Sequence, residues 1–247
     1  PSITGGRAVT QADQVFLGAP PVPEGAEIVC IGVSLGEEPE AWRRAALPFT
    51  TDAEQRQAQR FLHPIDGVRH LVGRGLARWV MRGIVGNVVG DFTVTPHGKP
   101  VCAGAGTDFS ISHSGNLVWI AFAGRGHVGI DVEQCRESRD LLRLASMLHP
   151  TEYAALQQCP PAELAPAFYR CWVRKEAVLK ACGTGLSLPL DRFRVFTDGR
   201  ARGWLESMDA RAVSDWFTED IPVLAGYYCG VAADFSSSEL RVVRVGC

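Results

Sequence analysis

Apolar residues in the first quarter of the chain fall into short segments with different spacing. The apolar run EIVCIGVSL, residues 27–35, predicts a strand. Residues 49–62 predict a helix, because Thr51 and Glu54 have the spacing of a capping box at its start. Residues 1–26 are rich in Gly, Pro and Ala, so we expect a loose arm there.

A longer helical pattern follows His63 and Pro64, with Asp66 expected as the N-cap. Its apolar residues recur every three or four positions, at Val68, Leu71, Val72, Leu76, Trp79 and Val80. Four arginines fall off this apolar stripe, namely Arg69, Arg74, Arg78 and Arg82. We expect most of them to form a solvated basic face.

From residue 91 the pattern changes to short strands separated by turns rich in Gly, Pro, Asn and His. These strands are expected at 92–95, 108–112, 116–123 and 127–133. Helical spacing returns at 138–148, at 151–158 and from about residue 163. Further strands are expected near 191–196, 200–205, 226–234 and 239–245. The same succession of strand, helix and strands occurs twice, which predicts an α+β fold of two comparable halves, 1–125 and 126–247.

Composition and charge exclude several classes of protein. The chain of 247 residues is 46% hydrophobic and 21% charged, with a formal net charge of −2, so nothing indicates nucleic acid or an anionic membrane as a partner. No apolar run approaches the roughly 18 residues of a membrane span, and the first residues lack the regions of a signal peptide. The eight cysteines form no C-x-x-C pair and no Cys/His set with zinc spacing. Reduced, mostly buried thiols in a cytoplasmic protein are therefore expected.

The stretch CWVRKEAVLKACGTGLSLPL, residues 171–190, mixes charged and aromatic residues on one predicted helix. Trp172, Glu176 and Lys180 are four residues apart and therefore share a face, with Lys175 beside them. Gly183 fits the left-handed position that follows a helix. Such a helix would contribute charged side chains to a site while its tryptophan anchors it in the core.

The segment VGIDVEQC, residues 128–135, carries two acids in a predicted strand. Asp131 and Glu133 are two residues apart, so their side chains point to the same side. Two acids on one face repel each other unless a cation lies between them, and oxygen-only ligands suit Mg²⁺ better than zinc. A solvent-facing edge strand would carry the same pair. Glu176 would favour the metal site only if its helix packs against this strand.

Three other positions could carry chemistry, each with a simpler alternative. Ser112 and His113 end a predicted strand but point to opposite faces, which disfavours a catalytic triad. His113 would then be either a hydrogen-bond donor to a phosphate or a turn histidine. Lys99 lies in the turn TPHGKP, where most lysines are simply solvated. Glu152 lies in the first turn of a predicted helix, where the helix dipole alone favours an acid.

Taken in order along the chain, these segments resemble the motifs of a known enzyme family. GKP, SISHSG, GIDVE, the T-E-Y acid, W-x-x-K-E-x-x-x-K and GTGLSLPL are similar to those of the Sfp-type 4′-phosphopantetheinyl transferases. The resemblance extends from about Arg60 to Phe196. That family transfers the phosphopantetheine arm of coenzyme A to a serine of an apo acyl, aryl or peptidyl carrier protein. It uses Mg²⁺ and releases 3′,5′-adenosine bisphosphate.

The resemblance also implies a fold and a role for each matching residue. The fold would be a pseudo-two-fold pair of similar α+β halves with the active site at their interface. Residues 1–125 would form the coenzyme A nucleotide side, and residues 126–247 would carry the metal site and the catalytic helix. The implied Mg²⁺ ligands are Asp131, Glu133 and Glu176. The implied coenzyme A contacts are Arg69, Lys99, Ser112, His113 and Lys180, with His113 near the 3′-phosphate. Glu152 would deprotonate the serine, and the alternative base would be a metal-bound water or Glu176. Lys180 would hold the phosphates.

The chain departs from the family pattern in one helix. Family members often carry lysines at the positions of residues 52–60, whereas Arg56 and Arg60 are the only bases here.

Two other functions are weighed against this resemblance. A non-catalytic coenzyme A or carrier-binding module would be expected to lack one of the acids. A Mg²⁺-dependent phosphohydrolase would bring a nucleophilic Asp or His or a second metal cluster. The length resembles that of the broad-specificity monomeric members, so a monomer is expected.

Overall fold

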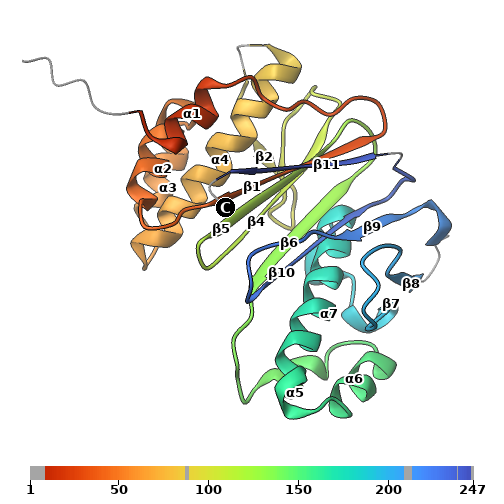
Figure 1. Cartoon of the computed structure of the whole chain (residues 1–247). Helices are drawn as coiled ribbons and strands as arrows, with labels where there is room; N and C mark the ends of the chain where they lie inside the picture. The colour runs from red at the N-terminus through yellow and green to blue at the C-terminus, as the bar shows by residue number, and fades with distance from the viewer. Residues whose placement is uncertain (1–8, 87–88, 209–212, 238, 246–247) are drawn as a thin grey trace, which may run out of the picture.

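The computed structural model describes residues 9–86, 89–208, 213–237 and 239–245 and has the predicted α+β fold (Figure 1). The strands of this part of the chain form two larger sheets and two short strand pairs. The four-stranded sheet has the order β11-β1-β5-β4, with β1 (Glu27–Ser34), β4 (Asp108–Ser114), β5 (Leu117–Ala123) and β11 (Glu239–Val245). The three-stranded sheet has the order β6-β10-β9, with β6 (Val128–Gln134), β9 (Phe217–Asp220) and β10 (Tyr227–Ala233). The short pairs are β2 (Thr93–Val94) with β3 (Pro100–Val101), and β7 (Phe193–Val195) with β8 (Leu205–Met208).

Both faces of the four-stranded sheet are covered, which explains why the sequences of β1 and β5 are apolar almost without a break. One face packs under the helices α1 (Gln11–Leu17), α2 (Pro39–Ala46) and α4 (Pro64–Val85), and α3 (Asp52–Ala58) packs on α4 (Figure 1). On this face Val29 and Ile31 of β1 join a core with Leu76 and Val80 of α4. On the opposite face, alternate residues of β1 and β5 pack against β6 and β10. The second sheet is therefore held against the first.

The N-terminal part is more ordered than its composition suggests. The expected loose arm contains α1, which begins with a capping box between Thr10 and Asp13, while residues 1–8 lie outside the described part. Helix α2 was not predicted. The capping box of Thr51 and Glu54 begins α3 as predicted. Helix α4 begins at Pro64 with His63 as the N-cap, so the prediction of Asp66 as the N-cap is wrong.

The prediction of a solvated basic face on α4 is also wrong. None of its four arginines is exposed, because first-half segments cover that face. Arg74 and Arg78 lie over the ring of Phe92, and Arg82 lies over the ring of Phe49. Arg78 is only 3% exposed and donates to both carboxylate oxygens of Glu54 at 3.0 Å. It donates further to the carbonyl oxygens of Phe49 and Gly90.

In the second half, helix α7 (Pro161–Cys182) lies directly on the strands β6 and β10 (Figure 1). It follows α5 (Leu141–Ala145) and α6 (Pro150–Gln157). A Cβ atom at Gly129 of β6 would lie 2.0 Å from the carbonyl oxygen of Ala177 and 2.4 Å from the amide nitrogen of Ala181. Only glycine therefore permits this close approach of helix and strand. The helix ends at Gly183, which has the predicted left-handed conformation.

The last strands differ from the predicted order in two ways. Strand β8 begins at Leu205, the last residue of the strand predicted near 200–205, and β9 was not predicted. Strand β11 pairs in parallel with β1 and so returns to the first sheet. The division of the chain at residue 125 remains a prediction.

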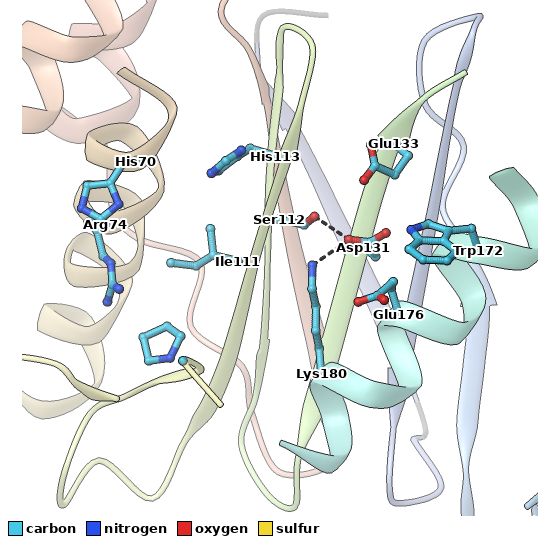
Figure 2. A pocket seen from close by; sticks show the side chains of 12 residues that line it. His70, Arg74, Ile111, Ser112, His113, Asp131, Glu133, Trp172, Glu176 and Lys180 are labelled. Atoms are coloured by element: carbon cyan, nitrogen blue, oxygen red, sulfur yellow. Dashed lines mark hydrogen bonds and ion pairs between the residues drawn. The ribbon is translucent and has the colours of Figure 1, made fainter. Parts of the chain in front are cut away.

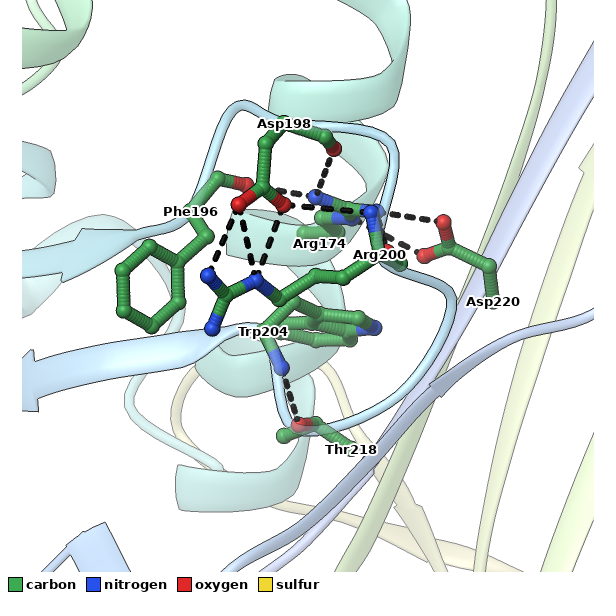
Figure 3. Close-up of polar contacts among 7 residues, drawn as sticks. All are labelled: Arg174, Phe196, Asp198, Arg200, Trp204, Thr218 and Asp220. Carbon is green, nitrogen blue, oxygen red and sulfur yellow. Dashed lines mark hydrogen bonds and ion pairs between the residues drawn. The ribbon is translucent and has the colours of Figure 1, made fainter.

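A buried arginine next to the charged face of α7 ties that helix to the loops around β9 (Figure 3). Arg174 is 0% exposed and pairs with the carboxylate of Asp220, donating from Nε at 2.9 Å. It also donates to the carbonyl oxygens of Phe196 and Arg200. Because its donors are satisfied inside the protein, Arg174 fixes the position of α7 relative to β9.

The described cysteines are free thiols. Cys30, Cys171 and Cys229 are buried and the other four are half-buried, so the prediction of mostly buried thiols is wrong. Within the described residues, no helix has the length and apolar character needed to cross a membrane.

Candidate functional site

The neighbouring edge strands β4 and β6 belong to different sheets, and side chains of β4 join them. Backbone amides of β6 donate to these side chains over 2.8 to 3.2 Å. The acceptors in β4 are Asp108, Ser110, Ser112 and Ser114, and the donors in β6 are Val128, Ile130, Val132 and Gln134. We call this contact the seam. It exists because β4 carries a polar side chain at every second position, and these positions share one face of the strand.

A cavity of about 490 Å³ opens over the seam. Figure 2 shows that its lining side chains come from α4 on one side, β4 and β6 along the base, and α7 on the other side. Six predicted site residues line it, namely Ser112, His113, Asp131, Glu133, Glu176 and Lys180. Six further residues were not predicted to line a site: His70, Arg74, Gly98, Pro100, Ile111 and Trp172.

The carboxylate of Asp131 lies at the centre of the acidic end of this cavity. Asp131 is 4% exposed, and its Oδ1 accepts from Lys180 Nζ at 2.6 Å and from Ser112 Oγ at 2.8 Å. Glu133 Oε2 accepts from Ser114 Oγ at 2.7 Å. Burial raises the pKa of Glu133, and the charge of Asp131 raises it further. Burial and then the charge of Asp131 also raise the pKa of Glu176. The acids therefore repel one another in a site with little solvent.

The chemistry of these donors fits Mg²⁺. Asp131 Oδ2 is buried and has no hydrogen-bond partner, which leaves a carboxylate oxygen free for a cation. No three His, Cys, Asp or Glu side chains of the described residues converge as metal ligands in this conformation. Lys180 occupies the other oxygen of Asp131. Holding Mg²⁺ would therefore bring Glu176, and the oxygen of Glu133 that does not contact Ser114, toward Asp131 Oδ2.

The opposite end of the cavity is basic. His70 and Arg74 of α4 and His113 of β4 point into it (Figure 2). His113 is exposed, but partial desolvation of its ring lowers its pKa, and the charges of Arg69 and Lys180 lower it further. Burial and the charge of Arg74 lower the pKa of His70, whose Nε2 is buried without a hydrogen-bond partner. The spacing of four residues between His70 and Arg74 could have indicated a shared helix face.

Two predicted coenzyme contacts lie beside the cavity rather than on its wall. Lys99 Nζ is paired with Asp108 and donates to the carbonyl oxygen of Val128 at 3.0 Å. Lys99 lines a smaller cavity of about 150 Å³, which also contacts Lys180. Arg69 pairs with Asp66 and donates from Nε to the carbonyl oxygen of Gly115 at 2.7 Å. Arg69 thereby holds the turn between β4 and β5, which begins after Ser114 rather than after His113.

Glu152 does not line the cavity. It is 2% exposed, and its Oε2 lies 2.8 Å from Nζ of the fully buried Lys175. The amides of His149 and Val195 donate to its two oxygens at 3.0 and 2.8 Å. Burial raises the pKa of Glu152 and lowers the pKa of Lys175. Lys175, whose role the sequence left open, also donates to two backbone carbonyls after α7.

Trp172 packs against the core of the second half, as predicted, and also lines the cavity. It stacks on Phe168 with ring centroids 5.7 Å apart. The apolar ring therefore closes one side of the acidic end.

A pocket with clustered carboxylates and a lysine at one end and basic side chains at the other suits the class of sites that bind phosphorylated molecules, because such groups stabilise phosphate oxygens. Comparison with known proteins agrees with this class. Residues 127–232 match the model of the 4′-phosphopantetheinyl transferase superfamily. The chain is 34% identical over 158 residues to the 4′-phosphopantetheinyl transferase HetI of Nostoc, which covers 61% of this chain and 67% of that protein. It is 32% identical over 193 residues to the 4′-phosphopantetheinyl transferase Sfp of Bacillus subtilis, covering 76% of this chain and 83% of that protein. The chain therefore belongs to the 4′-phosphopantetheinyl transferase superfamily.

Proposed function

We propose that the cavity over the seam transfers the phosphopantetheine arm of coenzyme A to a serine of an apo carrier protein, with Mg²⁺, and releases 3′,5′-adenosine bisphosphate. Membership of the family supports the activity. The observation that carries the proposal is the convergence of Asp131, Glu133, Glu176 and Lys180 on one cavity. Coenzyme A carries a diphosphate and a separate 3′-phosphate, and the cavity has an acidic end and a basic end that match this division.

The acidic end would bind the diphosphate. Asp131, Glu133 and Glu176 would hold Mg²⁺, which when bound neutralises the phosphate oxygens and stabilises the charge that develops on them during transfer. Lys180 is 29% exposed and faces the cavity, so its ammonium group would donate to the same phosphates when it leaves Asp131. Lys99, in the adjoining smaller cavity, would contact the coenzyme beside them.

The basic end would bind the 3′-phosphate. His113 keeps its proposed role, and His70 and Arg74 join it because their side chains face the same space (Figure 2). These residues would replace the lysines that family members often carry in the helix equivalent to α3. Arg69 would act through the β4–β5 turn that it holds.

The transfer also requires a base for the attacking serine. Glu176 faces the cavity, so one of its carboxylate oxygens would accept the serine proton while the other holds Mg²⁺. Glu152 is fully engaged by Lys175 and two backbone amides. We therefore propose Glu176 as the base and assign Glu152 to the support of α7.

One chain supplies both walls of the cavity, which supports action as a monomer. Sedimentation velocity of the protein alone would test this state, and a stable dimer would contradict it.

The function is tested by incubating the protein with coenzyme A, Mg²⁺ and an apo carrier protein and then measuring the mass of the carrier. We expect a gain equal to one phosphopantetheine group and an equivalent amount of 3′,5′-adenosine bisphosphate. Both products should be absent when EDTA replaces Mg²⁺. An unmodified carrier in a panel of acyl, aryl and peptidyl types would contradict the proposal.

A further inference from the structure

Two serine side chains of the seam contact the acids of β6 as well as its backbone. Ser112 Oγ accepts from the amide of Val132 at 3.2 Å and donates to Asp131 Oδ1 at 2.8 Å. Ser114, two residues further along the strand, has the same arrangement. Its Oγ accepts from the amide of Gln134 at 3.1 Å and donates to Glu133 Oε2 at 2.7 Å.

The direction of these hydrogen bonds follows from the atoms involved. A hydroxyl group has one proton and two lone pairs, and a backbone amide can only donate. The amide therefore occupies a lone pair, and the single hydroxyl proton remains for the carboxylate. A carboxylate that accepts this proton is held at one oxygen, so the direction of its other oxygen is restricted. Figure 2 shows the contact of Ser112 with Asp131 at the base of the cavity.

We propose that Ser114 is a positioning residue that holds Glu133 for Mg²⁺, and that β4 sets this ligand through the seam. Ser112 does the same for Asp131, in addition to any contact with the coenzyme. Asp131 supports the argument, because its Oδ1 is held by Ser112 and Lys180 while its buried Oδ2 has no partner. The inference rests on the proposed function, since it concerns the metal of that site.

The chain provides a matched control in Ser110. Ser110 is 2% exposed, and its Oγ accepts from the amide of Ile130 at 3.2 Å. Ser112 and Ser114 accept in the same way from amides further along β6. The β6 residue that precedes Ile130 is Gly129, which has no carboxylate. Ser110→Ala therefore removes a seam hydrogen bond of the same kind without touching a proposed metal ligand.

The test is the affinity for Mn²⁺, a probe for the Mg²⁺ site, measured by electron paramagnetic resonance of the free ion with saturating coenzyme A and no carrier protein. We expect Ser114→Ala to weaken Mn²⁺ binding by about tenfold or more. Ser114→Thr, which keeps the hydroxyl group, should restore most of the affinity, and Ser110→Ala should leave it unchanged. Circular dichroism and thermal unfolding would confirm that each variant is folded.

The possible outcomes separate the inference from the function. Wild-type affinity in Ser114→Ala, or an equal loss in Ser110→Ala, would overturn the positioning role while the metal site stands. Failure of Ser114→Thr to recover affinity would also count against it. Absence of Mn²⁺ binding by the wild-type protein would overturn the metal site and this inference with it.

Discussion

The ammonium group of Lys180 lies 2.6 Å from Oδ1 of Asp131 and thereby joins helix α7 to strand β6. The side chain of Asp131 is 5% exposed, whereas that of Lys180 is 29% exposed. In the proposed function, the lysine would therefore exchange Asp131 for a phosphate at the cavity surface, while the aspartate stays in place. This relationship connects the packing of α7 with the chemistry of the site.

Replacement of Lys180 by Met should slow transfer strongly. The methionine keeps the aliphatic packing but removes the charge that would stabilise the phosphates, and we expect a loss of about 10²–10³-fold in kcat. Rapid-quench measurement of carrier modification at saturating coenzyme A would provide this rate. An unchanged rate would show that Lys180 is only a structural partner of Asp131.

Substitution of Gly129 by Ala should displace α7. The added methyl group would lie 2.0 Å from the carbonyl oxygen of Ala177, so helix and strand must separate. We expect a loss of about 1–3 kcal/mol in the free energy of unfolding, measured with urea. Gly199→Ala serves as the control, because no atom lies within 4 Å of the added carbon at that position. Equal stability of the two variants would contradict the close packing at Gly129.

The buried pair of Glu152 and Lys175 should contribute to stability rather than to chemistry. Glu152→Ala leaves an unpaired buried ammonium group and should cost about 3–5 kcal/mol in urea unfolding. The double variant Glu152→Leu with Lys175→Met should recover much of this loss, because two apolar side chains replace the pair. Folded Glu152→Gln should retain transfer activity. A folded Glu152→Gln protein that binds coenzyme A but does not modify the carrier would restore Glu152 as the base.

Coenzyme A binding should involve proton uptake at His113. Partial desolvation and neighbouring positive charges lower the pKa of His113 in the free protein. A bound 3′-phosphate would raise this pKa, so binding should take up protons and strengthen as pH falls toward the ordinary histidine value of about 6.5. Calorimetry of coenzyme A binding in buffers of different ionisation enthalpy measures the number of protons taken up. The difference in this number between wild-type protein and His113→Gln gives the part due to His113. No difference between the two would exclude His113 as the phosphate contact.

Much of the fold and part of the site could be predicted from the sequence. Helical spacing placed Glu176 and Lys180 on one face of α7, and the period of a strand placed Asp131 and Glu133 on one face of β6. Such local patterns do not say which elements become neighbours. The parallel pairing of β11 with β1 depends on contacts distant in sequence, and no local pattern indicates it.

The basic end of the cavity shows the same limit. Arg74 and His70 fall outside the apolar stripe of α4, which is the pattern of a solvated face. Phe92 packs on Arg74, and side chains of β4, β6 and α7 line the other sides of the space, so this face becomes a wall of the cavity. Glu152 shows the same limit, because an acid in the first turn of a helix has the same sequence pattern whether it faces a substrate or a buried lysine.

The central claim is that Asp131, Glu133 and Glu176 bind coenzyme A through Mg²⁺. The most direct measurement is the calorimetric affinity for coenzyme A with Mg²⁺ and with EDTA, in wild-type protein and in Asp131→Asn. Asp140→Asn is a matched control, because Asp140 is exposed and its carboxylate pairs with Arg143 of the same helix, away from the proposed metal ligands. We predict that Mg²⁺ strengthens binding by about tenfold, or about 1.4 kcal/mol, in wild-type protein and in Asp140→Asn but not in Asp131→Asn. An equal gain from Mg²⁺ in all three proteins would contradict the account.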